Sequence, residues 1–159
     1  MPAIYLDHAA TSFPKAPGVG EAMADYIAHV GVNVNRGVYA PAQQAEQTVF
    51  AVREQLCRLF GLDDPARAIL TPGLTWRLHL LLQGLLRPGD HCICSALEHN
   101  AVARPLQALK QNGVSVSILP CDAQGREDVA ALDGLLRPNT RALVLCHASN
   151  VCGTLQPAR

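Results

Sequence analysis

After Gly61, short apolar runs alternate with longer stretches whose apolar residues recur at helical spacing. Alternating strands and helices are typical of a mostly parallel sheet, because parallel strands need a long crossover connection and a helix is the usual one. The turn signals 87–90, 112–113 and 137–139 fall where each helix would give way to a strand. We predict strands over 68–70, 91–94, 114–119 and 142–146, and helices over 74–86, 101–111 and 129–136.

The first 61 residues follow a different pattern. After an extended arm, apolar residues spaced for one helical face predict helices over 19–30 and 41–60, with Gly31 and Gly61 as stop signals. We therefore predict an N-terminal arm with two helices over 1–61, and an α/β domain that begins within 62–159. No internal repeat is evident.

The charges balance, with 13 Lys and Arg against 13 Asp and Glu. A net charge of zero gives no field that would attract nucleic acid or an anionic membrane surface, so neither partner is expected. The N-terminus has no leader-like apolar segment, and the most apolar stretch, 78–86, is too short to cross a bilayer. We expect a cytoplasmic protein.

The six cysteines show no CxxC spacing, and the six histidines show no HExxH spacing. Most of the cysteines lie inside apolar runs, where a thiol behaves as a small hydrophobic group. We expect reduced, structural thiols and no metal site.

Ligands of parallel sheets bind beyond the carboxyl ends of the strands. Three segments would lie there, namely 71–75, 95–100 and 147–154.

The segment 71–75 would leave a strand and open a helix. The backbone N–H groups of Gly73 and Leu74, with the hydroxyl of Thr75, would then face a ligand at a helix N-terminus, which favours phosphate. The alternative is that Gly and Thr serve only as helix caps. No GxGxxG or GxxxxGK[ST] motif specifies a nucleotide.

His99 follows the second predicted strand, where its ring could stack on an aromatic ligand or move protons near neutral pH. The alternative is a surface or capping histidine. The segment 147–154 offers the Asn150 amide, but alone it is an ordinary polar loop. Together the three segments predict a pocket for a small, planar, phosphorylated molecule.

Four segments carry a resemblance: Ile4-Tyr5-Leu6-Asp7-His8-Ala9-Ala10-Thr11-Ser12, the stretch 70–86, Glu98-His99-Asn100-Ala101-Val102, and His147-Ala148-Ser149-Asn150-Val151-Cys152-Gly153-Thr154. In this order and spacing they resemble the cysteine desulfurase-like proteins of the class V aminotransferase family, over essentially the whole chain. The resemblance implies part of the large domain of a fold-type I enzyme that uses pyridoxal phosphate as an electron sink.

The resemblance also implies roles for matching residues. His99 would be catalytic, stacking over the cofactor ring and helping to move protons, and Asn150 would hydrogen-bond the phenolic oxygen of the cofactor. Gly73, Leu74 and Thr75 would hold its phosphate. Ala9, Ala10, Asn35 and Arg36 would border the substrate entrance. The resemblance further implies L-cysteine as the substrate and a homodimer as the intact form.

Two departures from the family pattern stand out. Trp76 and His79 replace the usual Glu and Asn in the helix that opens the phosphate site. In relatives, the aspartate that pairs with the pyridinium, the Schiff-base lysine and the sulfur-accepting cysteine all follow the Asn150 loop, beyond Arg159. Lys15 and Lys110 match neither the position nor the context of that lysine, so we expect a truncated chain that is inactive by itself.

Three functional hypotheses remain open from the sequence. The first is the N-terminal portion of a cysteine desulfurase, or of a related aminotransferase or lyase, because the discriminating cysteine loop lies outside these residues. The second is a non-catalytic fragment or interaction module. The third is an unrelated phosphate-binding α/β domain.

Overall fold

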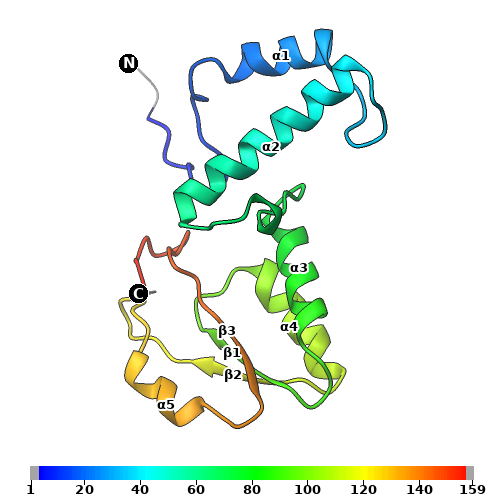
Figure 1. Cartoon of the computed structure of the whole chain (residues 1–159). Coiled ribbons are helices and arrows are strands. Elements are labelled where there is room, and N and C mark those ends of the chain that lie inside the picture. The colour runs from blue at the N-terminus through cyan, green and yellow to red at the C-terminus, as the bar shows by residue number, and fades with distance from the viewer. Residues whose placement is uncertain (1–3, 157–159) are drawn as a thin grey trace. The chain divides into compact units, whose positions relative to one another are not determined.

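A computed structural model describes residues 4–156, which belong to two compact units, Met1–Leu70 and Thr71–Arg159 (Figure 1). Each unit is considered by itself. The predicted domain limits of 1–61 and 62–159 stay a prediction, because compactness alone does not define the extent of a family domain.

The first unit contains α1 (Val19–His29), α2 (Ala40–Phe60) and the short 3₁₀ turn η1 (Pro65–Arg67). Both predicted helices are confirmed within two residues. Helix α2 ends at Gly61, whose positive φ of 64° lets the chain leave the helix, and whose N–H donates to the Cys57 carbonyl. The apolar face predicted for α1 is largely solvent-exposed in this structure, since no residue of the helix is buried.

The predicted strand over 68–70 is wrong. Ala68 has an extended backbone, but none of the other described residues supplies a hydrogen-bonded ladder beside it. A strand requires a neighbour for its N–H and C=O groups, and an apolar run of three residues cannot specify that neighbour. Ile69 is accordingly 66% exposed.

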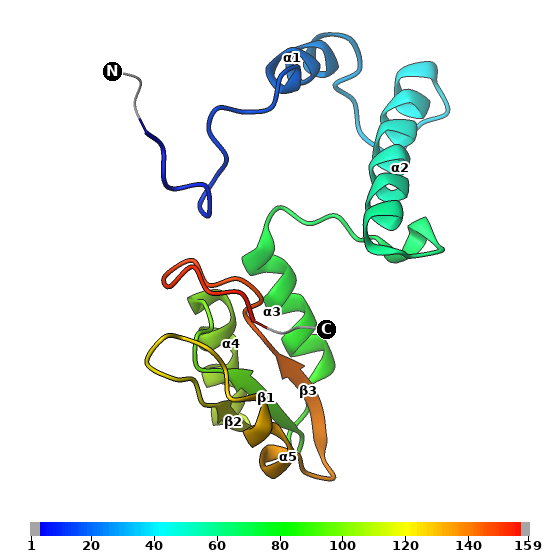
Figure 2. The ribbon, with the colours of Figure 1, turned by 90° about the vertical axis from the view of Figure 1, so that its left-hand side faces the viewer.

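The second unit is built on a parallel sheet of β1 (His91–Ser95), β2 (Ser115–Leu119) and β3 (Thr140–Val144) in the order β2-β1-β3 (Figure 2). Helix α4 (Asn100–Gln111) connects β1 to β2, and η2 (Val129–Ala131) with α5 (Leu132–Leu135) connects β2 to β3. The predicted α/β class with a parallel, helix-covered sheet is confirmed. The predicted helix over 129–136 is a 3₁₀ turn and one α-helical turn, capped by the Asp128 carboxylate.

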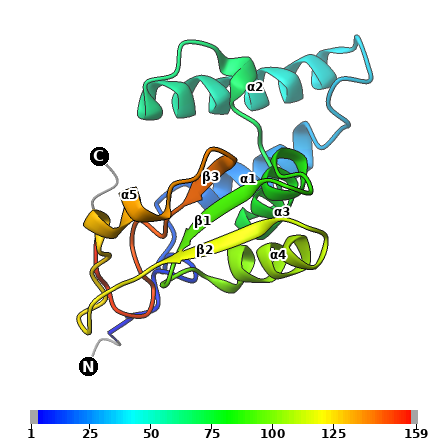
Figure 3. The same cartoon turned by 90° about the horizontal axis from the view of Figure 1, so that it is seen from below.

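Helices α3 (Leu74–Leu85) and α4 lie on one face of the sheet, and α5 lies on the other (Figure 3). Alternate residues of a strand point to the same face, so Cys92 and Cys94 of β1 both join the core under α3 and α4. These two thiols confirm the expected packing role. The core cluster comprises Leu82, Leu86, Cys92, Cys94, Val102, Leu106 and Val114.

A polar ladder crosses the opposite face near the amino ends of the strands. The fully buried His91 ring shares hydrogen bonds with Thr140 Oγ1 at 2.8 Å and Ser117 Oγ at 2.9 Å, and so joins all three strands. A hydroxyl both donates and accepts, so both ring nitrogens of a neutral His91 are satisfied. Burial, reinforced by the Arg137 charge, lowers the His91 pKa.

None of the described helices is long and apolar enough to cross a membrane.

The His91 ladder predicts a loss of stability in acid. Because the folded-state pKa lies below the usual value of 6.5, the unfolded chain binds the proton more readily, and stability present at neutral pH is lost as the pH falls. Urea unfolding between about pH 7.5 and about pH 5.5 should show a decline of at most about 1.4 kcal/mol per pH unit from this group.

His91→Gln should flatten that decline, whereas His147→Gln, at an exposed position of the same unit, should leave it unchanged. Equal slopes for the wild type and His91→Gln would show that the ladder does not control the acid sensitivity.

Candidate functional site

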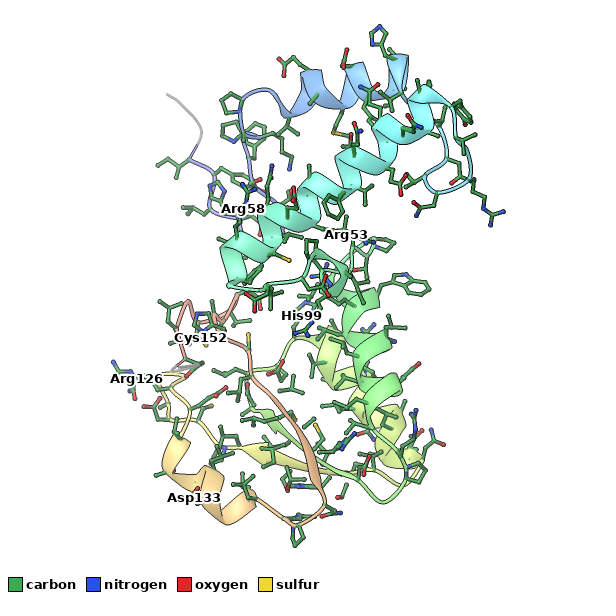
Figure 4. All side chains as sticks on the ribbon, viewed as in Figure 1. Arg53, Arg58, His99, Arg126, Asp133 and Cys152 are labelled. Carbon is green, nitrogen blue, oxygen red and sulfur yellow. The ribbon has the colours of Figure 1, made fainter. Side chains whose placement is uncertain are left out.

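The loops that leave β1 and β3 emerge side by side, because these strands are parallel neighbours in the sheet. The first loop carries His99 and the second carries Asn150. Helix α3 ends just before the start of β1, so the first turn of α3 lies toward the carboxyl edge of the sheet. Figure 4 shows His99 beside this first turn of α3. Three segments predicted from the sequence therefore share one edge of the second unit.

The first turn of α3 has no side-chain cap. Gly73 is the N-cap residue, and the nearby Thr71 hydroxyl donates to the Gly73 carbonyl at 3.2 Å instead of accepting from an amide. The N–H groups of Leu74, Thr75 and Trp76 belong to the turn whose amides cannot find acceptors within the helix. Gly73 thus occupies the cap position that the capping alternative predicts, and the free amides leave anion binding as a prediction. The segment follows no strand of the described chain.

His99 is the N-cap of α4, and its Nδ1 accepts the Ala101 N–H at 3.0 Å. The capping alternative is therefore part of its role. Because Nδ1 accepts, a neutral His99 carries its proton on Nε2, which has no protein partner in the described chain. The cap fixes the ring orientation and leaves Nε2 available to a ligand.

Asn150 lies at the tip of a loop held by the buried Ser149. The Ser149 hydroxyl accepts from the N–H groups of Val151 at 3.3 Å and Cys152 at 3.1 Å, and its carbonyl accepts from Gly153 at 2.9 Å. An antiparallel bridge between Ala148 and Leu155 closes the loop base. The Asn150 side chain is exposed and free to contact a ligand.

Two carboxylates near this edge were not predicted from the sequence. Glu98 Oε1 and Glu127 Oε1 are both buried without a hydrogen-bond partner in the described structure. Burial raises the pKa of Glu98, and the nearby Glu127 charge adds to the shift, although contacts with Ser95 and the Cys146 backbone oppose it. The sequence could have indicated Glu98, because Glu98 precedes His99 directly in the loop that follows the same strand.

The thiols of β1 and of the segment after β3 are held in their neutral form. Burial raises the pKa of Cys92 to about 11 and also raises those of Cys94 and Cys146, with the Glu98 charge contributing to each. These thiols are poor nucleophiles. Cys152, in the Asn150 loop, is exposed, and its sulfur lies against Gly125.

The four predicted substrate residues all lie in the first unit. Ala9 and Ala10 belong to a turn in which the Ala10 N–H donates to the Asp7 carbonyl at 3.1 Å. Asn35 has a positive φ of 63°, a conformation that asparagine tolerates better than most residues, and it precedes the exposed Arg36. All four side chains are solvent-exposed, and their substrate role stays a prediction.

Trp76, one of the departures from the family pattern, is 70% exposed on the first turn of α3. At that exposure its ring packs little against the other described residues. His79 lies one turn further along the helix and is half-buried.

No group of three or more His, Cys, Asp or Glu side chains among residues 4–156 is arranged to hold a metal ion.

A profile of the aminotransferase class-V family matches residues 4–159. A probable cysteine desulfurase of Pseudomonas putida is 36% identical over 157 residues, which cover 96% of this chain and 39% of that protein. The apo cysteine desulfurase of Thermococcus onnurineus NA1 superposes with a TM-score of 0.87 at 25% identity, over 97% of this chain and 39% of that chain.

A mutant of C-DES with glycine covalently linked to its PLP cofactor also superposes, with a TM-score of 0.64 at 25% identity, over 86% of this chain and 35% of that chain. This chain spans about 40% of the length of the curated relatives that it matches.

Replacing His99 should separate its capping role from its ligand role. His99→Ala removes the acceptor for Ala101 N–H and should cost about 1 kcal/mol of stability, whereas His99→Asn preserves a capping side chain and should cost less. Urea unfolding followed by circular dichroism measures both. Equal destabilisation by the two variants would contradict the capping geometry.

Proposed function

Because the chain belongs to the aminotransferase class-V family, we propose that it provides the cofactor-binding loops of a pyridoxal-phosphate-dependent cysteine desulfurase. The observation that carries the proposal is the gathering of an uncapped helix N-terminus, His99 and Asn150 at one edge of the sheet. The intact reaction would convert L-cysteine to L-alanine and leave the sulfur as an enzyme-bound persulfide.

The first turn of α3 suits the phosphate of the cofactor. The N–H groups of Leu74 and Thr75 and the Thr75 hydroxyl are donors, and the partial positive charge of a helix N-terminus favours an anion. Gly73 precedes them with an extended backbone and no side chain to cover the amides. When bound, pyridoxal phosphate supplies an electron sink for carbanionic charge.

His99 would stack on the cofactor ring and exchange a proton through Nε2. Its Nδ1 is occupied by the Ala101 N–H, so Nε2 is the ring nitrogen available to a substrate proton. The cap also prevents the ring from turning freely, which would keep its face oriented toward the ligand.

Asn150 would donate its side-chain amide to the phenolic oxygen of the cofactor. The buried Ser149 holds the loop by three backbone hydrogen bonds, so this donor would be positioned before the ligand arrives.

The substrate assignment extends the proposal to the first unit, where Ala9, Ala10, Asn35 and Arg36 would border the entrance. The Arg36 guanidinium suits the carboxylate of L-cysteine. A homodimer in the cytoplasm is part of the same proposal, supported by six free cysteines and by exposed apolar side chains on α3.

Two other functions are compatible with these residues. A class V aminotransferase or lyase would use the same loops on another amino acid. A non-catalytic interaction module is favoured by one specific observation, the exposed apolar surface of Trp76, Leu80 and Leu81 on α3. Release of alanine from L-cysteine by the intact enzyme would favour the desulfurase over an aminotransferase or lyase. Failure of the chain to bind pyridoxal phosphate would favour the interaction module.

The cofactor loops predict measurable binding of pyridoxal phosphate to the chain. Thr75→Val and Asn150→Ala should each weaken binding by about tenfold, since each removes one hydrogen bond to a charged or polarised oxygen. Fluorescence titration measures the affinity. Asn112→Ala, at the far end of α4, is the matched control and should bind normally; an equal loss in that variant would contradict the assignment.

The two lysines of the chain should not bind the cofactor covalently at a defined site. Lys15 donates to Thr11 Oγ1 at 2.6 Å and to the Ser12 carbonyl at 2.7 Å, and Lys110 lies in the last turn of α4, at the opposite end of that helix from His99. Borohydride treatment with pyridoxal phosphate, followed by peptide mass spectrometry, should give no stoichiometric adduct. A complete adduct at either lysine would overturn the assignment.

A further inference from the structure

A hairpin that follows β2 lies against the loop that carries Asn150 (Figure 2). The hairpin spans residues 121–127, and an antiparallel bridge between Cys121 and Glu127 closes it. The Asn150 loop follows β3, and β1 lies between β2 and β3 in the sheet. The hairpin therefore contacts a segment whose strand does not pair with its own.

The hairpin is fixed by polar contacts of its own. The Asp122 carboxylate accepts the N–H groups of Gln124 at 2.9 Å and Arg126 at 2.8 Å. The Asp122 backbone N–H donates to the Arg126 carbonyl at 2.9 Å, and the Asp122 carbonyl accepts the Gly125 N–H at 3.0 Å. These bonds leave the turn little conformational freedom, so the hairpin can support a neighbouring loop.

Gln156 joins the hairpin to the loop. Its side chain is buried, and its Oε1 accepts the Glu127 N–H at 3.0 Å while its Nε2 donates to the Gly125 carbonyl at 2.7 Å. One side-chain amide thus supplies the donor and the acceptor that a neighbouring strand would supply. The Gln156 backbone N–H donates to the His147 carbonyl at 2.8 Å, at the base of the loop that carries Asn150.

This contact depends on the chemistry of a glutamine side chain. A glutamate at position 156 would have no donor for the Gly125 carbonyl and would place a carboxylate against it. An asparagine is one methylene group shorter, and a methionine of similar length has no strong donor or acceptor. The buried Glu127 N–H would lose its partner in a methionine variant.

Gly125 allows the hairpin to approach the loop closely. It is buried at a positive φ of 74°, and a Cβ atom there would lie 3.2 Å from the Cys152 sulfur. That separation is shorter than an ordinary van der Waals contact. Cys152 belongs to the Asn150 loop, and its N–H donates to Ser149 Oγ at 3.1 Å. A side chain at position 125 would therefore push the loop away from the hairpin.

We propose that Gln156 and Gly125 are positioning residues, which hold the Asn150 loop against the hairpin and so place the Asn150 amide for the phenolic oxygen of the bound cofactor. The inference rests on the proposed function, in which Asn150 contacts that oxygen. Both residues act through Asn150, so the loss of either should weaken cofactor binding no more than the loss of the Asn150 amide itself.

Hydrogen exchange in the cofactor-free chain tests the positioning directly. Gln156→Met should speed exchange of the Glu127 and Gly153 N–H groups by at least about tenfold, while the amides of β1 stay slow and show that the unit is folded. Gln124→Met, the same substitution at an exposed position of the hairpin, should change neither group. Unchanged exchange of Gly153 in Gln156→Met would overturn the inference, whether or not the chain binds the cofactor.

A double-mutant cycle tests the connection to the cofactor. In a fluorescence titration with pyridoxal phosphate, Gln156→Met should weaken binding by about threefold to tenfold, and it should add no further loss to Asn150→Ala. Unchanged affinity in Gln156→Met, or a loss that adds fully to that of Asn150→Ala, would overturn the inference. Absence of binding by the wild-type chain would instead contradict the proposed function, and the exchange of Gly153 would then decide the positioning.

The contact at Gly125 has its own test. Gly125→Ala should weaken binding about as much as Gln156→Met, and Cys152→Ala should restore most of the affinity in the double variant, because it removes the sulfur that the new Cβ meets. Gly89→Ala is the control for backbone strain, since Gly89 has a φ of 90° and nothing within 4 Å of a Cβ. The same loss in Gly89→Ala, or no restoration by Cys152→Ala, would contradict the role of Gly125.

Discussion

The parallel pairing of β1 with both β2 and β3 is the constraint on which the second unit depends. Parallel strands separated by helices must all end at the same edge, so the residues after each strand are gathered there whatever their distance in sequence. This is why His99 and Asn150, 51 positions apart by their numbers, leave adjacent strands. The cofactor proposal follows from this arrangement more than from any single side chain.

The two edges of the sheet differ in how their polar groups are satisfied. At the amino edge, the buried His91 has a hydroxyl partner for each ring nitrogen, which closes that end with matched hydrogen bonds. At the carboxyl edge, the α3 amides lack a side-chain cap, and Glu98 and Glu127 each keep a buried oxygen without a partner. A ligand at the carboxyl edge would supply such partners, so this contrast supports the cofactor proposal.

The sequence predicts the elements that local pattern controls and misses those that depend on distant partners. Helices α2, α3 and α4 and the turn glycines follow from apolar spacing and turn chemistry. The run 68–70 has strand composition but no neighbour, which only the tertiary structure reveals. His91 and Glu127 were not recognised, nor was Gln156, whose side-chain Oε1 accepts the Glu127 N–H. Their hydrogen bonds join residues 26 or more positions apart.

The central claim is that one edge of the second unit holds pyridoxal phosphate through loops from three segments. Amide NMR of the labelled chain during titration with pyridoxal phosphate tests it most directly. The account predicts saturable shifts that cluster at 74–76, 98–101 and 149–152, with smaller changes around His91. Shifts confined to the neighbourhood of Lys15 or Lys110, or identical shifts with inorganic phosphate alone at all three segments, would contradict it.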